Sequence, residues 1–268
     1  MMIQQHFEGL SRYLERRNKK SLILESCAMS LWLLSASTTA AELNKYQIDV
    51  WADNWFSASI DGKPLFEDSV SIKTERSFNA ETHQFSSSLP FVLAFTIKDF
   101  KQNDTGLEYI GSNRQQMGDG GFITQITNLG SGNVVGVSNS TMRCKVIHKA
   151  PLDSSCVSQS KPVAGEGQCQ YTTSEAPATW KMSTFDDSLW KKATEYSAAQ
   201  VRPKDGYDKI SWDSSAKLIW TDDLEKDNTL LCRLTVHGAG DGKNISSPTE
   251  NKHTHTEMHS HFKHICKC

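Results

Sequence analysis

Two tryptophans with a polar pair between them are the residues of this sequence best suited to holding a ligand. Trp51 and Trp55 flank Asp53 and Asn54. An exposed indole can stack its flat apolar face on the C–H face of a sugar ring, while its N–H stays free to donate a hydrogen bond. The carboxylate and the amide beside it could bind hydroxyl groups. We therefore expect a weak ligand-binding site at these four residues, with core packing as the alternative for both indoles.

Histidines near the C-terminus form a second group with suitable chemistry, in this case for metals. Imidazole and thiolate ligands suit zinc, copper or nickel, and two cysteines follow the histidines. His255 and His259 are four apart, but Glu257 stands one place too late for the H-E-x-x-H motif. We predict weak metal binding by a disordered tail over 237–268, or else a solvated tail, or sequence from a shifted reading frame. The candidate ligands are His253, His255, His259, His261 and His264.

Side chains whose oxygen atoms could bind calcium also occur in the expected turns, but their sequence does not follow the pattern of a calcium-binding loop. No D-x-D-x-D-G pattern occurs, so turn formation and solvation are the favoured interpretation. The candidate calcium ligands considered are Asp186, Asp187, Asp222, Asp223, Asp227 and Asn228.

The sequence contains no recognisable catalytic pattern. It has neither a G-x-S-x-G elbow nor a phosphate-binding G-x-x-x-x-G-K-[ST] loop. His83 and His148 lie in strand-like segments, where a lone histidine is more often structural. The glycine-rich stretch 117–121 is expected to be a turn without a following helix. We therefore predict no enzymatic activity and no catalytic residues.

The cysteines indicate an oxidising compartment. Seven are present, and removal of Cys27 with an N-terminal signal would leave six. The central four, Cys144, Cys156, Cys169 and Cys232, permit three pairings. We favour Cys156–Cys169 as a local staple and Cys144–Cys232 as a bridge across the fold. In a secreted protein, three asparagines would also be glycosylation acceptors. They are Asn103, Asn139 and Asn244.

The N-terminal segment has the order of a secretory signal. Basic residues at 16–20 precede the apolar stretch 21–34, and small residues at 36–41 offer a cleavage site. We predict a signal peptide over 1–41, with a buried amphipathic helix as the alternative. The apolar stretch is shorter than the roughly 20 residues that a spanning helix needs. The expected location is therefore secreted or at the extracellular surface, without a membrane span.

The overall charge argues against nucleic acid as a partner. The formal net charge is −2 at pH 7, and the part between the two termini is mildly acidic. Such a chain has no field that would attract a phosphate backbone.

Between residues 46 and 236 the pattern is strand and turn. Apolar and other residues alternate over 55–60 and 91–98, and Asp61-Gly62 predicts a tight hairpin turn. Leu230, Cys232, Leu234 and Val236 would share the inward face of one strand. We expect a single β-sandwich over 46–236, or two small halves divided near 149–179, where proline, glycine and serine are frequent.

Short motifs in this region resemble the galactose-binding-like jelly-roll domains of secreted lectins and glycosidases. The segment W-x4-FDDSLW-x2-A at 180–193 looks like the opening of such a domain, and SAKLIW at 215–220 looks like the next strand. Residues 52–56 with 60–63 are similar to a later strand pair of the family. Here that pair comes first, which suggests a permuted sandwich or two modules.

The resemblance implies an all-β fold of the galactose-binding-like jelly-roll type, with Trp180, Trp190 and Trp220 in its core. It also implies a non-catalytic module that binds carbohydrate or glycoprotein. The alternatives are a structural or adhesive protein that binds other proteins, or weak metal binding through the tail. No cofactor is expected apart from a structural calcium ion, which many modules of the family hold.

Overall fold

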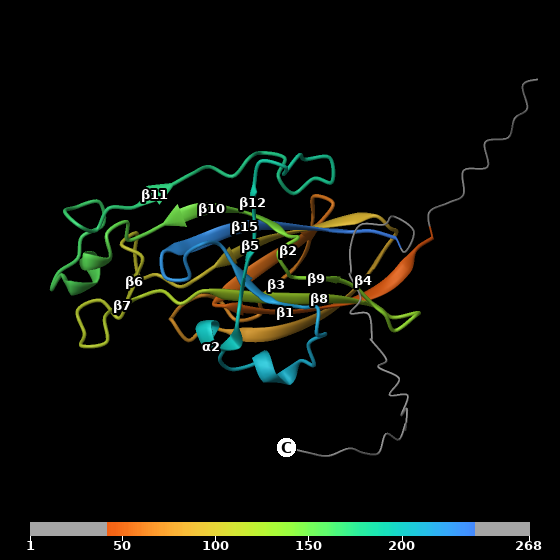
Figure 1. Ribbon diagram of the computed structural model, residues 1–268, viewed down its shortest axis with the longest axis horizontal. Helices are drawn as coiled ribbons and strands as arrows, with labels where there is room; N and C mark the ends of the chain where they lie inside the picture. The colour runs from red at the N-terminus through yellow and green to blue at the C-terminus, as the bar shows by residue number, and fades with distance from the viewer. Residues whose placement is uncertain (1–41, 239–268) are drawn as a thin grey trace, which may run out of the picture. The chain divides into compact units, whose positions relative to one another are not determined.

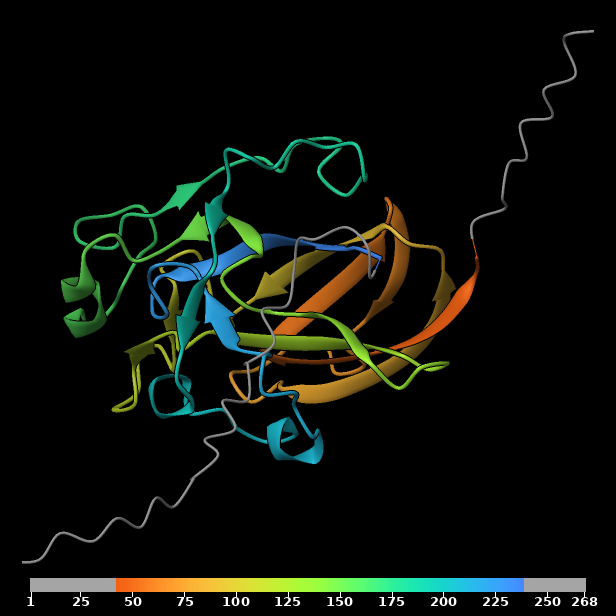
Figure 2. The same ribbon diagram turned by 45° about the vertical axis from the view of Figure 1, so that its right-hand side comes forward.

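Two antiparallel sheets packed against each other make up the fold in the computed structural model, which describes residues 42–238. Figures 1 and 2 show the two layers, with β1 and β8 in one and β5 and β15 in the other. The predicted all-β sandwich is thus confirmed. All the described residues lie in one compact unit. No helix among them is both long enough and apolar enough to span a bilayer.

The first sheet has the strand order β13-β14-β8-β1-β4, with β9 also paired to β8. Its long central strand β1 is antiparallel to both β4 and β8. The strands are β1 Asn44–Asp53, β4 Asn79–Ser87, β8 Gly121–Asn128, β9 Val134–Val137, β13 Thr194–Tyr196 and β14 Leu218–Trp220.

The second sheet has the order β11-β10-β15-β5-β2-β3, with β12 also paired to β10. Its strands are β2 Trp55–Ile60, β3 Lys63–Glu67, β5 Phe91–Lys98, β10 Arg143–Lys149, β11 Thr172–Thr173, β12 Lys191–Lys192 and β15 Asp227–Val236. A small third sheet pairs β6 Leu107–Glu108 with β7 Gln116–Met117. The helical turns are η1 Ser154–Ser158, α2 Ala198–Val201 and η2 Tyr207–Lys209.

The predicted hairpin turn at Asp61-Gly62 joins β2 to β3. Both residues have positive φ, 46° for Asp61 and 86° for Gly62. Two-residue hairpin turns of this kind match the right-handed twist of their strands, and Asp-Gly adopts them readily. Ile60 therefore pairs with Lys63 directly across the turn.

Alternate residues of the long strands fill the space between the two sheets. Leu230, Cys232, Leu234 and Val236 of β15 are all at most 5% exposed, as the pattern predicted. The rings of Phe95 on β5 and Phe122 on β8 meet edge to face at 5.1 Å, which joins the two layers. Burial of these aromatic and aliphatic groups supplies the main driving force for folding.

Two disulfides staple the second sheet and its long loop, in the pairing that the sequence favoured. Cys144 on β10 bonds to Cys232, its register partner on β15. Cys156 bonds to Cys169 and closes a local loop. The segment 149–179 is a loop that pairs with the sheet, since β11 within it adds to β10.

The tryptophans of the W-x4-FDDSLW motif are buried, but not between the sheets. Trp180 and Trp190 are 5% and 9% exposed and pack with Ala94 and Leu231 on the outer face of the second sheet. Trp220 alone of the three predicted core tryptophans lies between the layers. The motif therefore forms a cover over one sheet, which is why both faces of β5 and β15 are buried.

A buried arginine holds this cover in place. Arg233 on β15 is 3% exposed, and its Nε donates to Asp187 Oδ2 at 2.7 Å. Its other nitrogens donate to three backbone carbonyl oxygens of the loop, on Trp180, Met182 and Phe185. A charged group this deep is stable only when its donors are matched, and the loop supplies the acceptors.

We expect Arg233→Met to lower the free energy of unfolding by about 3 kcal/mol, because it leaves Asp187 and the loop carbonyls without their donor. Thermal unfolding followed by circular dichroism would measure this as a decrease in Tm of roughly 10 °C. The exposed Arg202 provides a control, and Arg202→Met should leave Tm nearly unchanged. Equal effects of the two substitutions would contradict this role for Arg233.

Candidate functional site

The four residues predicted to bind a ligand do not form a shared surface. Trp51 is fully buried, and its indole N–H donates to the carbonyl oxygen of Asp205 at 3.2 Å. Its ring packs edge-on against Tyr207, whose centroid is 5.8 Å away. The expectation that Trp51 is an exposed platform is wrong, because the segment containing α2 and η2 covers this face of β1.

Asn54 and Trp55 also have roles within the fold. Asn54 is fully buried and ties two loops together, since its Oδ1 accepts from Phe100 N at 2.6 Å and its Nδ2 donates to Glu75 O at 2.9 Å. Trp55 is half-buried, with the Lys98 ammonium 5.0 Å from its ring. Asp53 is fully buried as well, so it is not available to a ligand at the surface.

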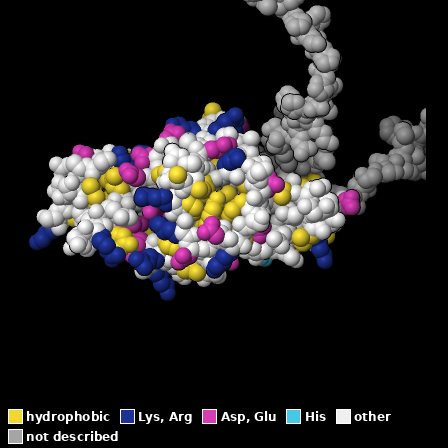
Figure 3. Space-filling view, turned by 60° about the horizontal axis from the view of Figure 1, so that its bottom comes forward, with side chains coloured by type: hydrophobic (Ala, Val, Ile, Leu, Met, Phe, Trp, Pro, Cys, Tyr) yellow, Lys and Arg dark blue, Asp and Glu magenta, His cyan; other side chains and the backbone are white. Residues whose placement is uncertain are grey.

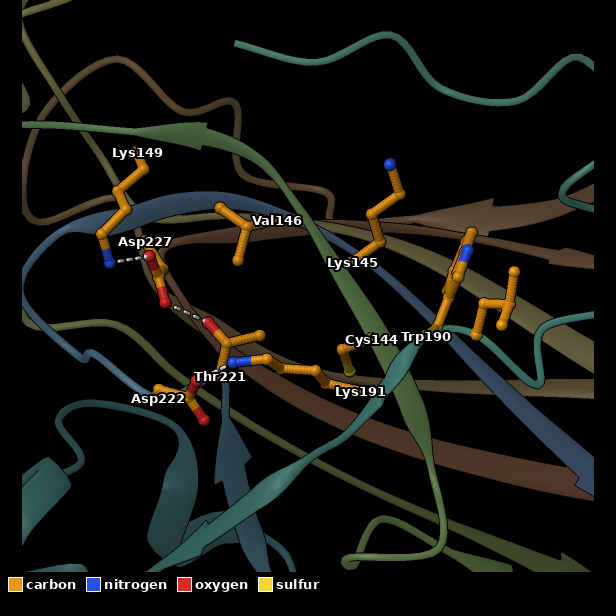
Figure 4. A pocket seen from close by; sticks show the side chains of 10 residues that line it. Cys144, Lys145, Val146, Lys149, Trp190, Lys191, Thr221, Asp222 and Asp227 are labelled. Carbon is orange, nitrogen blue, oxygen red and sulfur yellow. Dashed lines mark hydrogen bonds and ion pairs between the residues drawn. The ribbon is translucent and has the colours of Figure 1, made fainter. Parts of the chain in front are cut away.

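A pocket of about 550 Å³ lies at one edge of the second sheet instead. Its walls come from β10, from the end of the W-x4-FDDSLW cover, from the residues after β14 and from the start of β15 (Figure 4). The strands β11 and β12 pair with opposite ends of β10 and leave the middle of that strand facing the pocket. The lining residues are Cys144, Lys145, Val146, Lys149, Leu189, Trp190, Lys191, Thr221, Asp222 and Asp227.

Paired charges line one side of this pocket. Lys149 Nζ lies 2.7 Å from Asp227 Oδ1, and Asp227 Oδ2 accepts from Thr221 Oγ1 at 2.6 Å (Figure 4). The second pair, Lys191 with Asp222 at 2.5 Å, is largely exposed. Each pair offers a donor and an acceptor side by side, the arrangement that vicinal hydroxyl groups need.

Apolar groups and an uncompensated lysine complete the lining. Trp190 lines the pocket and is 9% exposed, and Leu189 beside it is 95% exposed. Arg143 fixes this wall by donating to the carbonyl oxygens of Ser188 and Trp190 at 3.1 and 2.8 Å. Lys145 forms no ion pair with any residue between 42 and 238. The pocket thus combines an apolar wall with polar groups of both signs.

A group of buried carboxyls lies elsewhere, at the end of the sandwich where β1 and β5 finish. Asp53, Asp99 and Asp119 each bring one carboxylate oxygen to within 4.8 Å of the others. Glu108 is 1% exposed and faces the same group. Lys204, from the loop after α2, contacts Asp53 Oδ2 at 3.3 Å and Asp119 Oδ2 at 2.8 Å. These five residues are the buried acidic cluster.

Burial dominates the protonation of this cluster. It raises the pKa of Asp53 to about 7 and the pKa of Glu108 to about 8, and the charge of Asp119 adds to both shifts. The pKa of Asp99 is raised well above its ordinary value for the same reason. Burial acts to lower the pKa of Lys204, but the charges of Asp53 and Asp119 outweigh it and raise that pKa.

The turn carboxylates considered as calcium ligands have other partners. Asp186 Oδ1 accepts from Ser188 N at 2.9 Å, which makes the predicted turn, and Asp187 binds Arg233. Asp222 and Asp227 pair with lysines, and Asp223 lies 3.6 Å from Lys149. Asn228 contacts the ring of His148 at 2.9 Å. Only part of the favoured interpretation, turn formation and solvation, describes these residues, because Asp227 and Asn228 are buried rather than solvated.

Two predicted glycosylation sites fall within the described residues. Asn103 is exposed, whereas Asn139 is half-buried and accepts from Thr141 N at 2.8 Å. The third, Asn244, lies outside the described residues, as do the predicted signal peptide and all five histidines of the tail.

Sequence reasoning missed most of the buried acidic cluster and the pocket lysines. The available signal was the M-G-D-G-G stretch, in which three glycines surround or follow Asp119. A Cβ on Gly118 would lie 1.7 Å from Asp99 Oδ2, and one on Gly120 would lie 2.4 Å from the Trp220 ring. Such glycines indicate close packing around a site.

Both signs of charge are interspersed on the face drawn in Figure 3, around a central patch of hydrophobic side chains.

The raised pKa of Glu108 predicts a pH-dependent stability. Between its ordinary pKa of 4.5 and about 8, the folded protein retains a proton that the unfolded chain has lost. The contribution of Glu108 to stability is therefore fully present below pH 4.5 and is lost as the pH rises towards 8. In the presence of a chelator of divalent cations, Glu108→Gln should have a higher Tm than the wild type across this range, by about 5 °C at pH 8. The exposed Glu166→Gln is the control, and parallel profiles for wild type and Glu108→Gln would contradict the prediction.

Comparison with protein-family models, with curated proteins and with solved structures gives no match to this chain. The galactose-binding-like resemblance remains a prediction from short motifs.

Proposed function

We propose that this protein is a secreted, non-catalytic binding module that recognises carbohydrate or glycoprotein at the pocket beside Trp190. The observation that carries the proposal is the pairing of an apolar wall, formed by Leu189 and Trp190, with the ion pairs Lys149–Asp227 and Lys191–Asp222. Sugars present both C–H faces and rows of hydroxyl groups, so a site for them needs both kinds of surface.

The size and position of the pocket support a small glycan as the ligand. Its volume of about 550 Å³ lies within the range of small-molecule sites, roughly 300–1,000 Å³. Its wall is held rigidly, since Arg143 fixes the Trp190 backbone and the Cys144–Cys232 bond fixes β10. A site prepared in this way loses little conformational entropy when a ligand binds.

The disulfides support an extracellular location. Both bonds would be reduced in an ordinary cytosol, where thiols are kept free. With the signal-like order of residues 1–41, they favour export of the chain.

Leu189 favours a second candidate, a protein partner. Its side chain is 95% exposed at the rim of the pocket, and a projecting aliphatic group of this kind is a common anchor in protein interfaces. An adhesive protein that binds other proteins would use Leu189 more than the paired charges.

The test is a glycan array probed with the full-length protein, followed by calorimetry with the strongest ligand. We expect Lys145→Ala to weaken binding about tenfold or more, because a charged hydrogen bond contributes about 1.5–3 kcal/mol. Lys63→Ala removes an exposed lysine of the same sheet outside the pocket and should bind as wild type does.

Two results would overturn carbohydrate recognition at this pocket. One is an array without a ligand, and the other is equal binding by Lys145→Ala and wild type. Capture of a protein that free sugars do not displace, and that Leu189→Ser abolishes, would favour the second candidate.

A further inference from the structure

We propose that Asp53, Asp99 and Asp119 form a calcium-binding site in which Glu108 contributes further negative charge. The carboxylates come from both sheets, since Asp53 ends β1, Asp99 follows β5, and Asp119 precedes β8. This site is separate from the pocket beside Trp190, and the inference does not depend on the function proposed there.

Buried oxygens without hydrogen-bond partners point to a cation as their ligand. Asp99 is 2% exposed, yet neither of its carboxylate oxygens accepts a hydrogen bond. Asp53 Oδ1 and Glu108 Oε1 are also buried without a partner. Buried polar atoms nearly always have hydrogen-bond partners, and a buried carboxylate without one costs several kcal/mol in general. A cation among them would satisfy all three side chains together.

The spacing of the oxygens admits calcium, and their chemistry favours a hard cation. Three carboxylate oxygens lie within 4.8 Å of one another, and oxygens on opposite sides of a calcium ion are about 4.6–5.2 Å apart. Magnesium would require about 4.0–4.2 Å between opposite oxygens and a strict octahedron. The three residues offer oxygen alone, with no nitrogen or sulfur, which excludes a preference for zinc or copper.

The surrounding backbone is shaped to admit these carboxylates. Gly118 leaves space that Asp99 fills, because a Cβ there would lie 1.7 Å from Asp99 Oδ2. Asp53 pairs in register with Gly121 across β1 and β8, which fixes its position relative to the glycine-rich turn. Both sheets and the glycine-rich turn therefore fix the positions of these carboxylate oxygens.

Lys204 balances part of the charge. Four carboxylates and one ammonium leave three negative charges uncompensated when all the acids are ionised. The Lys204 side chain is 36% exposed and Asp119 is 28% exposed, so this side of the cluster opens to solvent. Calcium can enter here as the flexible lysine moves its ammonium outwards.

Calcium titration of the full-length protein, after treatment with a chelator, tests the proposal. In calorimetry and thermal unfolding at pH 7.5, we expect one bound calcium ion. At millimolar calcium we expect a Tm increase of about 5 °C or more, as for ligand in roughly hundredfold excess over Kd. Absence of both heat and Tm shift in the wild type would overturn the proposal.

Asp99→Asn distinguishes a ligand from a structural acid. Asp99 makes no hydrogen bond, so the variant should fold and, in chelator, unfold at the same Tm as wild type or above it. Its calcium shift should disappear. A calcium shift that survives in Asp99→Asn would overturn the assignment of this residue, and a fall of Tm in chelator would show a structural role instead.

Two further variants complete the experiment. Lys204→Met removes the competing ammonium and should bind calcium at least tenfold more tightly, whereas weaker binding would overturn the displacement of Lys204. Asp208→Asn alters an exposed aspartate outside the cluster and should keep the full calcium shift. A magnesium shift equal to that of calcium would overturn the choice of ion.

Discussion

The burial of the Arg233 guanidinium is the constraint on which the outer layer of this protein depends. A cation on the outer face of a sheet would ordinarily be solvated, but here it is 3% exposed and its donors meet Asp187 and three loop carbonyls. The loop can satisfy the arginine only by lying flat on the sheet. Trp180 and Trp190 are buried as it does so, and Leu189 to Lys191 then form a wall of the pocket.

The molecule has two buried charged regions, one around Arg233 and one in the acidic cluster. They differ in how many of their polar atoms have a hydrogen-bond or ion-pair partner. Around Arg233 each guanidinium nitrogen has an acceptor, and the region behaves as part of the scaffold. In the acidic cluster, Asp99 and one oxygen each of Asp53 and Glu108 lack hydrogen-bond partners among residues 42–238, where Lys204 is the cation that pairs with the cluster. A folded protein retains such an imbalance where function requires it, because elsewhere it only costs stability.

Local patterns predicted the strands, the Asp-Gly turn and the inward face of β15, because a period of two and turn chemistry are local properties of the chain. They failed at Trp51, whose neighbours Asp53 and Asn54 suggested a surface. The segment with α2 and η2 that covers it is more than 140 residues away in sequence. The acidic cluster was equally hidden, since Asp53, Asp99 and Asp119 meet only when both sheets have formed.

The Cys144–Cys232 bond has a consequence for the order in which the structure opens. Strand β10 lies near the margin of its sheet, and on its outer side it pairs with two strands of two residues each. Such a strand would ordinarily fray before the rest of the domain. Its covalent link to β15, between β10 and β5, prevents separation unless the central strands yield as well. The pocket wall is therefore as durable as the interior of the sheet, although it lies at its margin.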